Sequence, residues 1–428
     1  GYIDTFPGSV PRVKADALML QNARTFIVGN APIIGHLDGQ GFSKRWFQAA
    51  AETWEDIRNV DVAMEGAVPL TSTAALYSET MRLHRATEKR PVAFRESVVG
   101  ALETLTYSGR PVESIPEFRL TNEVLQELDL LILPEVDALS SQHAELIRRW
   151  VSDGGTLIAT GKCGLLDEQR RERSNFALAD VLGVDYEYEE KKYAYDSNGS
   201  LKEGVIQTYL QSTGHALTKS LETSTVGLPG SFLSLNKHAS ATEIFSYRLP
   251  WMVEDLKNNQ WFNWGPPPPG KELGGIAGVY NKFGQGQVVY VGVPLFESVH
   301  GGDLYFDSRD RFWIRKWVPN LVRQLVPNPI AELKSKVLSE FIHGTFFYDQ
   351  SRRYIIVQIL NAVELVTEAQ YATVPEVEIR INPKKLKVTA AHEVWPKKKD
   401  LKVVPREGKL CISVPDPERY TALYLKLG

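Results

Sequence analysis

Residues 128–168 read LDLLILPEVDALSSQHAELIRRWVSDGGTLIATGKCGLLDE, and this stretch decides how the chain folds. Residues 128–133 are almost wholly apolar, which predicts a strand that is covered on both faces. Ser140 or Ser141 can cap the helix that follows, and Asp153-Gly154-Gly155 ends that helix. Residues 156–160 predict a second strand. A strand, a crossover helix and a strand in so few residues specify a parallel pair.

The carboxyl ends of such strands are where open α/β sheets place their chemistry. The loops after Leu133 and Thr160 are therefore the first places to look for a site. Around them we predict a central α/β domain in residues 66–330, with a long insertion in residues 169–270. Its further strands are predicted at residues 73–77 and 112–115 and in a hairpin at 275–280 and 287–292, and its further helices at residues 94–107, 121–127 and 311–325.

The two ends of the chain predict different architectures. Residues 1–65 follow a β-α-β-α pattern, with strands expected at residues 2–5 and 24–28 and a long helix at residues 43–58. Two such units cannot bury their own sheet, so we expect them to need neighbouring strands from elsewhere. Residues 331–428 contain several strand-like segments separated by turns and lack convincing helices. This spacing predicts a small antiparallel β-sandwich.

Composition limits the classes of function. The chain has 428 residues and a net charge of -3, which argues against nucleic acid as a main partner. No apolar run is long enough for a membrane span. Cys163 and Cys411 lie far apart and suggest neither a metal site nor a disulfide framework, so we expect no metal and no cofactor. The compartment stays open, with the cytoplasm favoured because no signal-like segment opens the chain.

Five motifs carry a resemblance to a known family. They are AALYS at residues 74–78, DLLILP at 129–134, GGTLIATG at 154–161, LDE at 166–168 and FALADVLG at 176–183. With this order of parts, the chain resembles the family 42-like glycoside hydrolases, which include the β-galactosidases. The central part is similar to the β-galactosidase trimerisation domain, whose fold is similar to that of class I glutamine amidotransferases. The resemblance covers residues 60–330 well and the two ends by layout only.

The resemblance implies an α/β chain in three parts. Residues 1–65 would be the last units of a partial (β/α)8 barrel. Residues 66–330 would be a flavodoxin-like or amidotransferase-like parallel-sheet domain, and residues 331–428 the antiparallel β-sandwich. The family uses two carboxylates at barrel strand ends. The strand for the acid/base residue would lie before residue 1, so the chain alone is expected to be unable to hydrolyse a glycoside.

Strand-end logic selects the candidate site residues of the barrel part. Asp4 follows the first expected strand and would be the catalytic nucleophile, unless it is a turn or capping aspartate. Asn30, His36 and Asp38 follow the second expected strand in the sequence GNAPIIGHLDG, and side chains of these types bind sugar hydroxyls. A glycine-rich connecting loop is the alternative interpretation.

Other candidates lie in the central domain and the C-terminal part. Trp261 and Trp264 could stack on sugar rings, form a subunit contact or simply cover the core. Cys163 sits where an amidotransferase-like domain could place its nucleophile, but Leu165 stands where such a loop needs glycine. A buried structural cysteine is the other interpretation. Residues 397–399 are three lysines that we interpret as a solvated hairpin tip.

These observations leave three hypotheses about function. The first is the C-terminal portion of a retaining glycoside hydrolase with a carbohydrate substrate, completed by a missing barrel segment or companion polypeptide. It would be a homo-oligomer, a trimer by resemblance. The second is a non-catalytic assembly or carbohydrate-binding module. The third is a cysteine amidase or glutaminase-like enzyme that uses Cys163.

Overall fold

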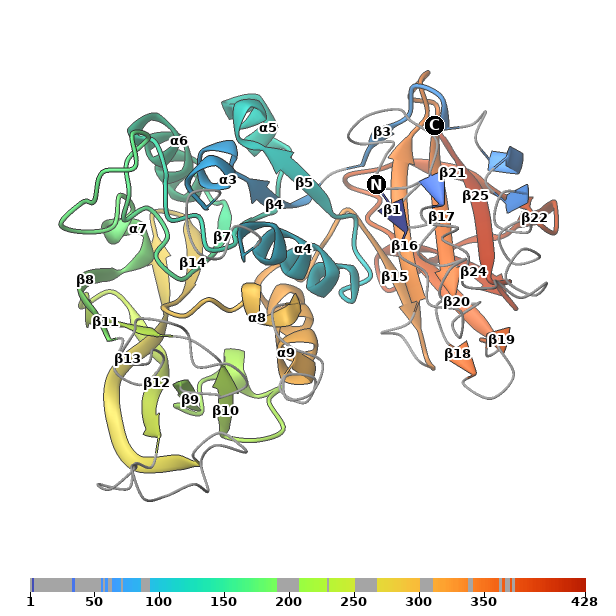
Figure 1. Cartoon of the computed structure of the whole chain (residues 1–428). Coiled ribbons are helices and arrows are strands. Elements are labelled where there is room, and N and C mark those ends of the chain that lie inside the picture. Colours follow the sequence, from blue (N-terminus) through green and yellow to red (C-terminus); the bar gives the residue numbers. More distant parts are fainter. Residues whose placement is uncertain are drawn as a thin grey trace. The chain divides into compact units, whose positions relative to one another are not determined.

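The structure is a computed structural model in which strands predominate and helices are few (Figure 1). It describes residues 2–3, 33–34, 55–56, 58–60, 64–70, 72–85, 93–190, 208–228, 231–250, 268–300, 311–337, 342–361, 364–365, 370–371 and 374–428. The chain divides into two compact units. Unit 1 holds residues 1–72, 106–112 and 328–428, and unit 2 holds residues 73–105 and 113–327.

A nine-stranded sheet forms the centre of unit 2, in the order β10-β9-β12-β13-β14-β7-β6-β4-β5. Its five strands from β14 to β5 run parallel to one another. They are β14 (Gly286–Val291), β7 (Thr156–Thr160), β6 (Leu130–Leu133), β4 (Thr73–Tyr77) and β5 (Glu113–Pro116). The predicted parallel pair of β6 and β7 is therefore confirmed.

Helix α6 (Ser141–Ser152) connects β6 to β7 and shows why the stretch folds locally. The hydroxyl of Ser140 accepts the N–H of His143 at 3.0 Å and caps the start of the helix. Ile147, Trp150 and Val151 are buried on one side of α6. At its end Gly154 adopts a φ of 120°, a conformation that favours glycine.

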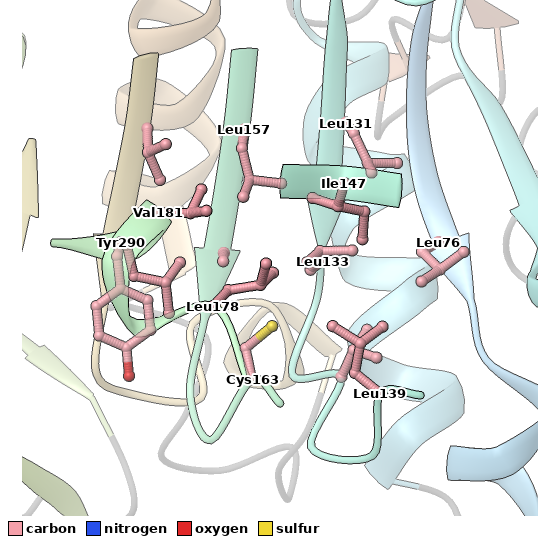
Figure 2. Close-up of a cluster of buried hydrophobic side chains, with 14 of the residues drawn as sticks. Leu76, Leu131, Leu133, Leu139, Ile147, Leu157, Cys163, Leu178, Val181 and Tyr290 are labelled. Atoms are coloured by element: carbon pink, nitrogen blue, oxygen red, sulfur yellow. The ribbon is translucent and has the colours of Figure 1, made fainter. Parts of the chain in front are cut away.

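The core of unit 2 lies between this helix and the sheet. Figure 2 shows Leu131, Leu133, Ile147, Leu157 and Val181 as parts of one apolar cluster. The remaining helical segments of the unit are α3 (Glu79–Arg85), α4 (Ala93–Thr106), η1 (Glu117–Arg119), α5 (Asn122–Gln126), α7 (Ala179–Leu182), η2 (Ala216–Thr218), α8 (Glu297–His300) and α9 (Arg311–Leu325).

The predicted insertion extends the same sheet instead of forming a separate layer. Its strands β9 (Thr208–Ser212), β10 (Thr225–Leu228) and β12 (Thr242–Pro250) join the sheet through β13 (Pro269–Phe283). β13 pairs antiparallel with β14, as the hairpin pattern predicted. A separate two-stranded sheet contains β8 (Val184–Glu190) and β11 (Phe232–Lys237).

Two facing sheets give the C-terminal part of unit 1 the character of a β-sandwich. The first has the order β15-β20-β24-β23, and the second has the order β22-β21-β25-β17-β16-β3. Their strands are β15 (Ala331–Ser335), β16 (Ile342–Tyr348), β17 (Tyr354–Asn361), β20 (Glu376–Ile381), β21 (Val388–Trp395), β22 (Lys399–Leu401), β23 (Val403–Arg406), β24 (Lys409–Pro415) and β25 (Tyr420–Leu427). Leu333 and Ile379 from one sheet and Val357 and Leu423 from the other share one buried cluster.

The other face of the six-stranded sheet is covered by the N-terminal part of unit 1. Val60, Met64 and Ala67 pack there against Phe347 and Ile356. Directly after them β3 (Val68–Pro69) pairs antiparallel with β16 as the last strand of that sheet. The segment that was expected to complete a barrel thus ends on the C-terminal sandwich. The short strands β18 (Glu364–Leu365) and β19 (Gln370–Tyr371) form a further pair.

Candidate functional site

The N-terminal site residues predicted from the sequence are Asp4, Asn30, His36 and Asp38, and all four lie outside the described residues, as do Trp261 and Trp264. The strands beside them are described: β1 (Tyr2–Ile3) pairs with β2 (Ile33–Ile34) in parallel. Asp4 therefore directly follows β1 in the sequence. His36 and Asp38 follow β2 in the sequence. The second expected strand, residues 24–28, which Asn30 follows, lies outside the described residues.

In unit 2 two glutamates, Glu117 and Glu135, are the main polar groups at the carboxyl ends of the parallel strands. Glu117 follows β5, and Glu135 follows β6 by one proline. Both belong to a Pro-Glu dipeptide at a strand end, Pro116-Glu117 and Pro134-Glu135. That pattern was readable in the sequence but was not used to select candidates.

Glu117 organises the start of helix α3. Its carboxylate accepts the hydroxyl of Ser78 at 2.8 Å and the backbone N–H of Thr80 at 3.1 Å. Nδ1 of His143 lies 3.5 Å from the same carboxylate. Burial raises the pKa of Glu117, but the hydrogen bonds from His143, Ser78 and Thr80 outweigh burial and lower it to about 2. The group is therefore an ionised helix cap whose oxygens are already engaged.

The crevice between β4 and β6 is where strand order reverses, and ligands of open α/β sheets bind at such points. Here a side chain of the chain itself fills it. Met81, on the helix that follows β4, is 0% exposed. Its sulfur accepts the backbone N–H of Ala138 at 3.0 Å, in the loop after β6. The usual ligand position of this fold is thus occupied by α3 and the β6–α6 loop.

Glu135 is a carboxyl group enclosed by protein, at 2% exposure. It adopts a φ of 48°, a left-handed conformation that is uncommon outside glycine. Its carboxylate accepts the hydroxyl of Thr160 at 2.8 Å and the backbone N–H groups of Phe296 at 2.9 Å and Glu297 at 3.2 Å. Burial raises its pKa to about 7, although the hydrogen bonds from Ser97, Phe296 and Thr160 favour the ionised form.

Cys163 lies in the core of unit 2 and not in a reactive position. It is 0% exposed, and Figure 2 shows its sulfur among apolar side chains of the cluster, with Leu139 and Leu178 nearby. Burial, with Asp137 and Glu135 close by, raises the pKa of its thiol. A nucleophilic cysteine needs an accessible thiolate and the opposite shift.

Two N–H groups that flank Cys163 are already engaged in backbone hydrogen bonds. The N–H of Gly161 donates to the carbonyl of Val291 at 2.9 Å, and the N–H of Gly164 donates to that of Val136 at 2.9 Å. An oxyanion hole requires such N–H groups to point at the substrate. The geometry therefore favours the structural cysteine over an amidase nucleophile.

A shallow hollow of about 500 Å³ lies at the tip of the β21–β22 hairpin in unit 1 and is lined by His392, Glu393, Val394, Lys398, Lys399 and Asp400. Nζ of Lys399 lies 3.3 Å from the buried carboxylate of Glu393, and Nδ1 of His392 lies 2.6 Å from Asp400. Lys397 contacts Glu418 at 3.7 Å. The lysine run is at a hairpin tip, as predicted, but two of its lysines are in ion pairs.

The described residues hold neither a metal-binding cluster nor a membrane-spanning helix. No group of three or more His, Cys, Asp or Glu side chains in this part of the chain could hold a metal ion. Among the helices that the structure describes, none is long and apolar enough to cross a membrane.

No protein family model and no curated protein matches the chain. Solved structures do match it in fold. The α-L-fucosidase isoenzyme 2 from Paenibacillus thiaminolyticus aligns with a TM-score of 0.67 and 15% identity, over 99% of this chain and 58% of that one. A β-galactosidase from Bacillus circulans sp. alkalophilus aligns with a TM-score of 0.57 and 12% identity, over 96% and 52%.

A catalytic mutant of a GH42 β-galactosidase from G. stearothermophilus gives a TM-score of 0.55 at 15% identity, over 99% of this chain and 51% of that one. The chain therefore has a glycoside hydrolase-like fold and spans between 51% and 58% of the length of these three structures. At such identities the likeness concerns the fold alone.

Proposed function

We propose that the chain is the C-terminal portion of a retaining glycoside hydrolase of the family 42-like type. Residues 1–65 would supply the last units of the catalytic barrel, and the rest would supply the assembly domain and the β-sandwich. The observation that carries the proposal is the likeness in fold to a fucosidase and two β-galactosidases over 96% to 99% of this chain. The substrate class is a glycoside, with fucosides and galactosides as the first candidates.

The pairing of β1 with β2 supports the barrel assignment of residues 1–65. Tyr2 lies opposite Ile33 in a parallel register, so about thirty residues separate two neighbouring parallel strands. That spacing suits one β/α unit of a barrel. Parallel pairing also brings the carboxyl ends of β1 and β2 to the same edge, directly before Asp4 and Gly35.

In the proposed mechanism Asp4 is the nucleophile. Its carboxylate would attack the anomeric carbon and form a glycosyl ester while an acid on the missing barrel part protonates the leaving oxygen. The residue that served as the acid would then act as a base and deprotonate a water molecule. This water would cleave the ester and restore Asp4. Asn30, His36 and Asp38 would bind sugar hydroxyls, and Trp261 and Trp264 would stack on the sugar.

The buried contacts of unit 2 support an architectural role for its sheet. Met81 fills the crevice, Glu117 caps a helix and Cys163 is in the core. The second candidate function is a non-catalytic module for assembly, in which unit 2 would build a homo-oligomer such as a trimer. The two functions are compatible within one complete enzyme.

The experiment begins with the coding sequence upstream of Gly1, read for a barrel with a strand-end carboxylate. The longer polypeptide and the 428-residue chain are then assayed on 4-nitrophenyl α-L-fucoside and 4-nitrophenyl β-D-galactoside. We expect activity only in the longer form. Asp4→Asn in that form should lower kcat by at least about a thousandfold, whereas the exposed Asp153→Asn is the matched control.

Two results would contradict the proposal. Hydrolysis by the 428-residue chain alone would show that no further barrel is needed. A longer polypeptide that folds but cleaves no glycoside of a broad panel would leave only the assembly function. Analytical ultracentrifugation of both forms tests that second function directly, since a monomer at micromolar concentration would exclude it.

A further inference from the structure

The carboxyl group of Glu135 connects three elements of unit 2 that are distant in sequence. It follows β6, it accepts a hydrogen bond from Thr160 at the end of β7, and it accepts two from the start of α8. Ser97 of α4 is a further hydrogen-bond partner. The carboxyl group is thus the polar contact through which residues 293–299 are held against the ends of two parallel strands.

Among the described residues, the donors to this carboxyl group are all neutral. They are two hydroxyl groups and two backbone N–H groups, and Glu135 forms no ion pair within the described part of the chain. An ionised carboxylate that is buried without a cation is costly even when it is hydrogen-bonded. The ionised form of Glu135 therefore destabilises the closed arrangement that buries it, whereas the protonated form does not.

The charged and titratable groups near Glu135 strengthen this effect. Glu297, on α8 itself, has the same sign and raises the pKa of Glu135 further. Asp137 in the β6–α6 loop and Glu135 both raise the pKa of Cys163, which follows β7. Asp137 and Cys163 in turn raise the pKa of Tyr290 on β14. Lys162, the cation nearest in sequence to Cys163, is paired with Glu189 at 2.9 Å.

We propose that the protonation state of Glu135 controls how firmly residues 293–299 are held. The protonated carboxyl group holds this segment against the sheet, and the ionised carboxylate loosens it. The repulsion between Glu135 and Glu297 acts directly on the segment that is held, because Glu297 belongs to it. Loosening lets water reach the carboxylate and separates the two charges. Phe296 and Val299 are fully buried, so the loosened state is a minor one at any pH.

The sign of the pH dependence follows from burial. In the closed segment the pKa of Glu135 is raised to about 7 from its ordinary value of 4.5, which it regains when water reaches it. The free energy that favours the closed state is therefore greatest below the ordinary pKa of 4.5, and it is lost as pH rises through the raised pKa of about 7. Between pH 5 and pH 8 the population of the open segment should rise on the order of tens-fold.

Hydrogen exchange of the Phe296 and Glu297 amides, corrected for intrinsic rates, measures this opening in the 428-residue chain. We expect the tens-fold rise in wild type and less than about a threefold rise in Glu135→Gln, which cannot ionise. Glu117→Gln is the matched control and should keep the wild-type profile. Equal pH profiles in wild type and Glu135→Gln, or a flat wild-type profile, would overturn the proposal.

Thr160→Val gives a second test if Glu135→Gln does not fold. It removes a donor that favours the ionised form, so the rise in exchange should move to higher pH. An unmoved midpoint would count against the proposal. This device is independent of the proposed hydrolase activity.

Discussion

The indole N–H of Trp395 donates a hydrogen bond to the carboxylate of Asp56, 2.9 Å away and 339 positions earlier in the chain. Trp395 ends strand β21 of the six-stranded sheet, and Asp56 lies in the helical segment that covers that sheet. Val60 and Met64 of the same segment are buried against it. The end of the N-terminal region and the C-terminal sandwich therefore share a core.

The Asp56–Trp395 pair should be energetically coupled. Asp56→Ala and Trp395→Phe should each destabilise the chain by about 1–2 kcal/mol, since each removes one partner of a buried hydrogen bond to a carboxylate. The double variant should fall short of the sum by about 1 kcal/mol. Urea unfolding of the four proteins measures the cycle. Additive effects would mean that the two side chains do not interact in solution.

Glu117 should stabilise unit 2 only where it is ionised. Its pKa is lowered to about 2 from an ordinary 4.5, so its contribution is complete above the higher value and is lost as pH falls toward the lower one. We expect Glu117→Gln to cost roughly 2 kcal/mol at pH 7 and progressively less between pH 4.5 and pH 2. Urea unfolding across this range gives the difference from wild type. The exposed Glu127→Gln should show no such trend, and a constant difference for Glu117→Gln would refute the assignment.

Leu133 should be among the most costly positions to truncate. Its side chain is 0% exposed at the end of β6 and lies in the cluster of Figure 2. Leu133→Ala leaves a cavity and should cost about 2–5 kcal/mol in unfolding free energy. Leu83, 55% exposed on α3, is the matched control, and Leu83→Ala should change stability by less than about 0.5 kcal/mol. Similar costs at both positions would contradict the placement of β6 in the core.

Cys163 should behave as a core residue. Iodoacetamide should not label it in the native chain at pH 7 and should label it in urea, as mass spectrometry of the peptides would show. Cys163→Ser should destabilise more than Cys163→Ala, by about 1–3 kcal/mol relative to wild type, because a hydroxyl group would be buried among apolar side chains. Rapid native labelling would reopen the amidase hypothesis.

Much of the fold could be predicted because local patterns were strong. The predicted strands at residues 73–77 and 156–160 and the helix at 311–325 match β4, β7 and α9 in their bounds. In each the apolar spacing agrees with one type of element. Strands β9, β10 and β12 were only weakly indicated by the sequence, since their place in the sheet depends on partners far along the chain.

The candidate site was harder to predict than the fold. Strand-end reasoning selected Asp4, Asn30, His36 and Asp38 in the N-terminal region, which stay predictions. It missed Glu117 and Glu135, although both follow strands. Nothing local distinguishes a glutamate that caps a helix from one that is enclosed by protein, because the difference lies in the donors that other elements bring.

The sequence by itself determined the parallel βαβ core, the β-strands of the C-terminal part and a helix cap at Ser140 or Ser141, of which the structure uses Ser140. These follow from apolar periodicity and turn chemistry over a few neighbouring residues. Only the tertiary structure decided that β9, β10 and β12 extend the central sheet, that Met81 fills its crevice and that Glu117 and Glu135 have opposite pKa shifts. Burial and hydrogen-bond partners set these properties, and both arise from segments that meet only when the chain folds.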